Sequence, residues 1–184
     1  MKVITGIAKG KPLETLKGED VVRPTSQMAK EGIFSAVQFY VAGAKTLDLF
    51  AGSGQLGIEA LSREASLCVF VDQSREAVEI IIKNLKYTNL FSKSRVITSE
   101  ATRYLKFCKE EFDIVFIDPP YNKGLCNDVL PFVGDVLTDN GFVFCETDRR
   151  ETLEETYGSL KLKKCYRYGK ALVWLYQKNS EIGE

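Results

Sequence analysis

Phe112-Asp113-Ile114-Val115-Phe116-Ile117-Asp118-Pro119-Pro120-Tyr121 is an apolar run that ends abruptly in an acid, two prolines and an aromatic ring. A continuous apolar run of this length is typical of a parallel strand that is buried on both faces. Open α/β folds bind their ligands at the carboxyl ends of such strands. The stretch therefore predicts a parallel sheet with the tetrapeptide from Asp118 to Tyr121 at its ligand-binding edge.

The tetrapeptide suits attack by an exocyclic amino nitrogen on an electrophilic methyl group. The lone pair of a nucleobase amine is delocalised into the ring, so the amine must be held before it can react. The Asp118 carboxylate and the Pro119 carbonyl can each accept one N–H, and Pro120 stiffens the turn because proline fixes φ. We expect Tyr121 to stack on the base, a contact worth about 1–3 kcal/mol. The structural alternative is a strand that merely ends at a proline-rich turn.

Length and charge limit the classes of protein. A chain of 184 residues suits one domain with a buried core. It carries 25 basic and 25 acidic residues, and a net charge of zero is unusual for a nucleic-acid binder. The charges are unevenly spread, because residues 1–30 carry +3 and the remainder −3. A polyanion is therefore expected to meet the N-terminal segment first.

The chain contains no histidine, and its five cysteines are scattered without a C-x-x-C pair. We therefore expect no zinc or other metal, no disulfide framework and no His-based catalysis. No apolar run approaches the ~18 residues of a membrane span, and the first four residues begin neither a signal nor a transit peptide. These features predict a soluble, cytoplasmic protein, and we expect it to act as a monomer.

From Thr46 the chain alternates between strand and helix patterns, which favours an α/β fold with a doubly wound parallel sheet. The predicted strands are 46–51, 67–72, 95–98, 112–117 and 141–146, and the predicted helices are 55–63, 74–87, 101–110, 124–137 and 149–157. Pro131 is expected to kink or shorten the fourth helix. Residues 160–168 and 170–177 predict a terminal antiparallel hairpin. Before Thr46, residues 2–14 predict a short hairpin and residues 27–41 a helix.

Asp48-Leu49-Phe50-Ala51-Gly52-Ser53-Gly54-Gln55-Leu56-Gly57 predicts a strand, a glycine-rich turn and a helix. Its G-x-G-x-x-G spacing lets the backbone approach a ligand and points a helix N-terminus at it, which fits NAD as well as S-adenosylmethionine. We expect the turn residues to contact the cofactor, namely Phe50, Ala51, Gly52, Ser53 and Gly54.

Acidic residues favour S-adenosylmethionine over NAD. Asp48 is placed to meet the methionyl ammonium, Asp72 the ribose hydroxyls, and Glu100, followed by Ala101, the adenine amine. The structural alternatives are a solvated strand end for Asp72 and an N-cap for Glu100. Together with Asp118 these are four acidic residues at the ends of successive predicted strands, which makes coincidence the poorer explanation.

With these motifs in place, the chain resembles the RsmD-like family of 16S ribosomal RNA guanine-N2 methyltransferases over nearly all residues from 3 to 178. The resemblance rests on Arg23-Pro24-Thr25, on Leu47 to Gly54 with Leu56 to Arg63, on Asn84-Leu85, on Phe112 to Tyr121 and on Gly169 to Tyr176. The Asp-Pro-Pro-Tyr tetrapeptide is shared by many amino-methyltransferases, whereas Arg-Pro-Thr joined to the long glycine-loop match is more specific.

The resemblance implies a class I S-adenosylmethionine-dependent methyltransferase fold with an N-terminal hairpin. From the patterns along the chain we expect a hairpin and loop (1–24), a methyltransferase domain (25–178) and a disordered tail (179–184). The resemblance also implies methylation of one guanine in small-subunit RNA that already carries ribosomal proteins. Candidate RNA contacts are Lys9, Lys11, Arg23, Thr25 and Lys123. The chain departs from the family pattern at Gln27 and Met28, at Asp72 where glutamate is common, and at Glu100 where aspartate or asparagine is.

Three other functions stay open. An adenine-N6 methyltransferase on DNA or RNA would use the same tetrapeptide. A nicotinamide-dependent oxidoreductase would use the same glycine turn but leaves Asp118 to Tyr121 unexplained. A non-catalytic RNA-binding assembly factor is disfavoured by the intact Asp48 and Asp118.

Overall fold

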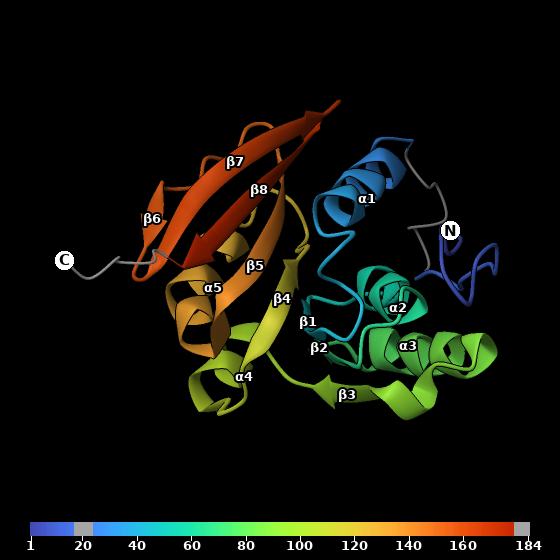
Figure 1. Cartoon of the computed structure of the whole chain (residues 1–184). Helices are drawn as coiled ribbons and strands as arrows, with labels where there is room; N and C mark the ends of the chain where they lie inside the picture. The colour runs from blue at the N-terminus through green and yellow to red at the C-terminus, as the bar shows by residue number, and fades with distance from the viewer. Residues whose placement is uncertain (17–23, 179–184) are drawn as a thin grey trace.

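A computed structural model describes residues 1–16 and 24–178, without the side chains of residues 24–26. The predicted contact Arg23, the side chain of Thr25 and the predicted disordered tail 179–184 lie outside this description. One eight-stranded sheet forms the centre of the molecule, in the order β3-β2-β1-β4-β5-β8-β7-β6 (Figure 1). The doubly wound α/β fold predicted from the sequence is confirmed.

Five parallel strands alternate with helices along the chain, as the pattern predicted. The parallel strands are β1 (Lys45–Leu49), β2 (Leu67–Asp72), β3 (Ser94–Thr98), β4 (Phe112–Ile117) and β5 (Leu137–Asp148). The helices between them are α2 (Gln55–Ser62), α3 (Arg75–Thr88), α4 (Ala101–Phe107) and α5 (Leu125–Val133), with 3₁₀ turns η1 (Phe91–Lys93) and η2 (Gly134–Val136). Helix α5 ends two residues after Pro131, earlier than the predicted 137, as expected of proline inside a helix.

Two antiparallel strands extend the sheet beyond β5. Strand β8 (Ala171–Lys178) pairs with β5, and β7 (Leu160–Tyr168) pairs with β8. The predicted terminal hairpin is therefore present, and β6 (Thr156–Tyr157) adds a short edge. Side chains alternate along β8, so that Val173 and Leu175 face one core while Trp174 and Tyr176 face the other.

The sheet separates two hydrophobic cores. Helices α2, α3 and α1 (Pro24–Ala36) cover one face, and α4 and α5 cover the other (Figure 1). Phe116 and Phe144 are neighbours on the first face, and Asp48 lies between Phe116 and Phe70; the three rings are at most 1% exposed. Burial of both faces explains why β2 and β4 are almost continuous apolar runs, whereas the edge strand β3 is only partly buried. No helix among the described residues is long and apolar enough to cross a membrane.

Three local predictions need revision. The predicted helix 149–157 is wrong, because this segment is irregular up to β6. Its backbone is held by tertiary bonds instead, from the Arg149 N–H to the Lys170 carbonyl and from the Tyr176 hydroxyl to the Glu154 carbonyl. The predicted helix 27–41 runs from Pro24 to Ala36, and the predicted N-terminal hairpin consists of one antiparallel bridge between Lys2 and Pro12.

Candidate functional site

The glycine-rich turn joins the end of β1 to the start of α2. Gly52 and Gly54 have φ of 55° and 77°, which is the left-handed region that glycine enters without steric cost. Phe50 adopts φ of 57° in the same turn. A bulky residue in this region is strained, and such strain collects at ligand-binding turns.

Gly57, the last glycine of the G-x-G-x-x-G motif, is needed for close packing rather than for its backbone conformation. A Cβ on Gly57 would lie 2.3 Å from the Phe70 ring and 2.6 Å from the Cys68 sulfur. Only glycine therefore lets α2 pack this closely against β2. Its backbone N–H donates to the Asp48 carboxylate over 2.8 Å, which ties the helix to the end of β1.

Asp48 is the buried acid of the site. Its side chain is 2% exposed, and burial raises the pKa of Asp48 to about 8, although the Gly57 N–H and the nearby Lys30 ammonium act in the opposite direction. The negative charge of Asp72 adds to the increase. A carboxylate that is costly to ionise in the empty protein is well suited to receive a cationic ligand group.

One cavity brings the predicted cofactor and catalytic residues together. It is lined by Asp48, Phe50, Ala51, Gly52, Ser53, Gln55, Leu56 and Asp118. The turn between β1 and α2 thus faces the end of β4, because these two strands are neighbours in the sheet. Gln55 and Leu56, which were not among the predicted cofactor contacts, contribute the first turn of α2 to the same wall.

Asp72 and Glu100 stand at the carboxyl ends of the next two strands. Asp72 accepts the Gly52 N–H over 2.9 Å and the Ser74 N–H over 2.8 Å, so it holds the glycine turn in shape. Glu100 occupies the N-cap position of α4, but its exposed side chain makes no capping bond. The N-cap position expected as the structural alternative for Glu100 is therefore confirmed, but its side chain does not cap the helix; the adjacent Ala101 is buried.

The tetrapeptide leaves the sheet at the end of β4. Pro119 is buried, Pro120 is exposed and Tyr121 is half-buried. The Tyr121 hydroxyl donates to the carboxylate of Glu146, which is 6% exposed and comes from β5. Burial raises the pKa of Glu146, and the bond from Tyr121 partly opposes this. Glu146 was missed from the sequence; the signal was a single acid that closes the apolar run from Phe142 to Cys145.

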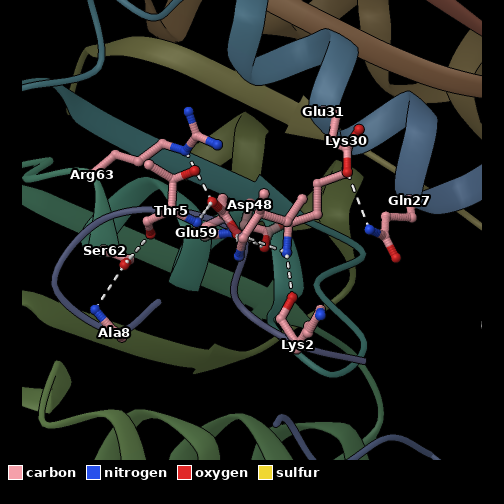
Figure 2. A network of polar contacts seen from close by, with 12 residues as sticks. Lys2, Thr5, Ala8, Gln27, Lys30, Glu31, Asp48, Glu59, Ser62 and Arg63 are labelled. Atoms are coloured by element: carbon pink, nitrogen blue, oxygen red, sulfur yellow. Dashed lines mark hydrogen bonds and ion pairs between the residues drawn. The ribbon is translucent and has the colours of Figure 1, made fainter. Parts of the chain in front are cut away.

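A second buried network lies beside Asp48 (Figure 2). Glu59 of α2 is fully buried and accepts the Lys30 ammonium over 3.0 Å and the Arg63 guanidinium over 2.9 Å. It also accepts the backbone N–H groups of Ile4 and Thr5. Burial alone would raise the Glu59 pKa, but these partners outweigh it and hold the pKa below its usual value.

Lys30, the other partner of this ion pair, has a lowered pKa. Lys30 of α1 is 3% exposed, and burial lowers its pKa although Glu59 opposes the change. The network joins α1, α2 and the N-terminal segment, which are far apart in the sequence. Glu59 and Lys30 have no recognisable sequence signal for this role, since exposed helix positions commonly carry the same residue types.

The structure places the predicted RNA-contacting lysines near two different edges of the sheet. Lys11 donates to the Tyr87 carbonyl over 3.1 Å, at the last turn of α3 and away from the sheet edge where that helix begins. Lys9 is exposed on the same segment, whereas Lys123 is exposed two residues after the tetrapeptide. Of the three, only Lys123 lies beside the cavity-forming strand ends.

Comparison with known proteins places the chain in a family. A family model described as conserved hypothetical protein 95 matches residues 1–177. The chain belongs to this RsmD-like family. It is similar to a putative rRNA methyltransferase of Bacillus subtilis, YlbH, with 38% identity over 97% of the chain and 99% of the relative.

Further members of the family support the same placement. The ribosomal RNA small subunit methyltransferase D of Escherichia coli K12 is 30% identical over 98% of the chain and 91% of its own length. A solved structure of the putative methyltransferase yhhF from E. coli matches with a TM-score of 0.86 and 30% identity, covering 98% of the chain and 99% of that structure. The predicted RsmD-like resemblance and class I methyltransferase fold are confirmed.

Proposed function

We propose that the chain transfers a methyl group from S-adenosylmethionine to the exocyclic N2 of a guanine in small-subunit (16S) ribosomal RNA. The proposal is supported by family membership and by relatives whose names include small-subunit rRNA methyltransferase. The single observation that carries it is the cavity shared by Asp48, the glycine turn and Asp118. That cavity puts a cation-accepting carboxylate and an amine-accepting carboxylate within one space.

The residues of the cavity fit a sulfonium amino acid nucleoside. Gly52 has no atom closer than 3.9 Å to where a Cβ would stand, so its backbone is open to a ligand. Asp48 would bind the methionyl ammonium, Asp72 the ribose hydroxyls and Glu100 the adenine amine. When bound, S-adenosylmethionine supplies an electrophilic methyl group on a positively charged sulfur.

Asp118 and the Pro119 carbonyl would each accept one N–H of the guanine N2. This arrangement turns the nitrogen lone pair towards the methyl group. With the donor bound, N2 would take the methyl group from the sulfonium, whose sulfur would keep the electron pair of the broken C–S bond, and Asp118 or water would accept the N2 proton. Positioning and electrostatics account for most of the rate, because no histidine is present to act as a base.

Tyr121 would stack on the guanine face, and its bond to Glu146 sets the orientation of the ring. The target guanine has to leave its stack, because N2 of a stacked and paired base cannot reach the cavity. The RNA partner is the small subunit or an assembly intermediate, where such a base can be unpaired.

Incubation with labelled S-adenosylmethionine and unmodified small-subunit particles or protein-free RNA tests the proposal, followed by nucleoside analysis. N2-methylguanosine is the expected product. Detection of N6-methyladenosine instead would show that the enzyme methylates adenine. Calorimetry that detects NAD binding but no S-adenosylmethionine binding would replace the proposal with the oxidoreductase alternative. Asp118→Ala should abolish turnover while donor affinity is retained; equal loss of donor binding would make Asp118 a structural residue.

A further inference from the structure

Strand β7 carries a concentration of positive charge in a neutral chain. Residues 160–170 contain five cations and no acid, namely Lys161, Lys163, Lys164, Arg167 and Lys170. All five are exposed, and none forms an ion pair with any residue of 1–16 or 24–178. Seven other cations of the described chain do form such pairs, so this strand keeps its charge available to a partner.

The sheet register places one end of β7 at the same edge as the cavity. Strand β7 is antiparallel to β8, which is antiparallel to β5, so β7 runs in the direction of the parallel strands. Tyr168 is paired with Ala171, and Ala171 with Asp148 at the carboxyl end of β5. The Arg149 N–H donates to the Lys170 carbonyl over 2.9 Å and fastens the hairpin turn to that edge.

Two tyrosine rings of β7 lie on the face of the sheet that bears Glu146. Tyr166 is opposite Val173, which is opposite Glu146, and residues directly opposite each other share a face. Two strand spacings separate Tyr166 from Glu146, which is about 10 Å. Tyr166 and Tyr168 are half-buried because α1 packs against this face, with the Tyr168 hydroxyl next to Gly32. Their ring centroids are 6.5 Å apart and their planes are inclined by 18°. The Lys164 ammonium stands 4.9 Å from the Tyr166 ring centroid.

Near-parallel aromatic rings with cations beside them form the kind of surface that binds single-stranded nucleic acid. Bases stack on the rings regardless of sequence, and the cations contact the phosphates. Duplex RNA does not fit this description, because its bases are not available to stack on side chains. The sheet face between the cavity and these rings is covered, since Glu146 and Val173 are buried and α1 packs against β7 and β8. A strand that leaves the cavity at Asp118 would therefore reach the exposed parts of the rings along the carboxyl edge of the sheet.

We propose that Lys164, Tyr166, Arg167, Tyr168 and Lys170, called here the β7 surface, bind the single-stranded RNA that flanks the target base. The identity of this RNA rests on the proposed function. Tyr166 and Tyr168 stack on neighbouring bases, and Lys164 and Lys170 contact the phosphates. Arg167 projects from the opposite face of the sheet, where it is paired in register with Leu172. It neutralises phosphates of the RNA as the RNA passes the hairpin turn.

Direct RNA binding tests the β7 surface without requiring methyl transfer. The probe is a fluorescein-labelled single-stranded oligoribonucleotide of about 12 nucleotides, which matches the site sizes of such surfaces. Binding to the full chain is measured by anisotropy over a range of salt concentrations. The double variant Arg167→Ala/Lys170→Ala is compared with Lys161→Ala/Lys163→Ala, which removes the same charge from the other half of β7.

The variant Arg167→Ala/Lys170→Ala, called here the tip variant, should weaken RNA binding about tenfold. It should also reduce the slope of log K against log salt by about 1.4, the value for two phosphate contacts on a single strand. The matched control should change the slope by less than half as much. Tyr166→Leu should weaken binding about tenfold, and Tyr166→Phe, which keeps the ring, should recover most of that affinity. Unchanged thermal unfolding midpoints show that the variants are folded.

The outcomes separate this inference from the proposed function. RNA binding that depends on the β7 surface, in a chain that methylates no small-subunit RNA, would support the surface and refute the activity. Normal methylation with equal RNA affinity in both double variants would refute the surface and leave the activity standing. Equal losses in the tip variant and its control would also refute it, because they indicate general charge attraction.

Discussion

Asp48→Asn tests the main electrostatic claim about the site, because it should stabilise the empty protein and weaken donor binding. In the native protein the pKa of Asp48 is raised from 3.8 to about 8, so between these values the native state holds a proton that the unfolded state has lost. Stability therefore falls as pH rises through this window. Asparagine is neutral throughout and escapes that loss.

The size of the effect follows from the same pKa values. A change from 3.8 to about 8 corresponds to at most about 6 kcal/mol above pH 8, at 1.36 kcal/mol per pKa unit. The asparagine Oδ1 can still accept the Gly57 N–H, but its buried amide N–H₂ group lacks a partner, which costs about 1–3 kcal/mol. We expect a net gain of about 3 kcal/mol at pH 8.5 and none at pH 5.

Urea unfolding of both proteins at the two pH values, without donor, measures this gain. Asp113→Asn serves as control, since the Asp113 carboxylate is half-buried at the opposite edge and accepts the Lys45 N–H over 2.8 Å. The control should show no gain at pH 8.5. An Asp48→Asn protein that is less stable than wild type at pH 8.5 would refute the claim that the buried charge is costly.

The affinity for S-adenosylmethionine should rise with pH over the range in which the stability of the donor-free protein falls. Only the ionised form of Asp48 attracts the methionyl ammonium, and that form rises from about 1% at pH 6 to half at pH 8. Because about half of the donor amine has lost its proton by pH 8, the wild-type dissociation constant should fall about 20-fold over this range. Above pH 8 the affinity should decline again as the donor amine, with a usual pKa of about 7.7–8.0, loses its proton. Calorimetry across this range checks the profile, and a flat profile, or one unchanged in Asp48→Asn, would contradict the assigned role.

Three further predictions concern packing around the cavity. Gly57→Ala should destabilise the chain by about 2 kcal/mol or more, because its Cβ meets Phe70 at 2.3 Å; a variant with unchanged unfolding would mean that α2 can move away from β2 freely. Glu59→Gln should cost about 3–5 kcal/mol by leaving Lys30 buried without its counter-charge, and adding Lys30→Met should recover part of this; a double variant as unstable as the single one would contradict the pairing. Tyr121→Phe should keep donor affinity and lower turnover about tenfold, because the ring loses the Glu146 contact that orients it; unaltered kinetics would show that the bond is dispensable.

The sequence by itself determined the fold class and the location of the site. Continuous apolar runs predicted buried parallel strands, and the glycine motif predicted the turn after β1. In a parallel sheet all strands end at one edge, so Asp48, Asp72 and Asp118 were expected to gather there before any contact was known. The structure brings Asp48 and Asp118 into one cavity and ties Asp72 to the turn that lines it.

Only the tertiary structure decided the contacts between distant segments. The bond from Tyr121 to Glu146, the burial of Glu59 under Ile4 and Thr5, and the position of Tyr166 beside the catalytic edge all depend on strand order and register. The predicted helix 149–157 failed for the same reason, because tertiary bonds outweigh its local helix propensity. Local patterns record the burial of each residue but not its neighbour, and pairing across more than 20 residues is set by how the whole sheet assembles.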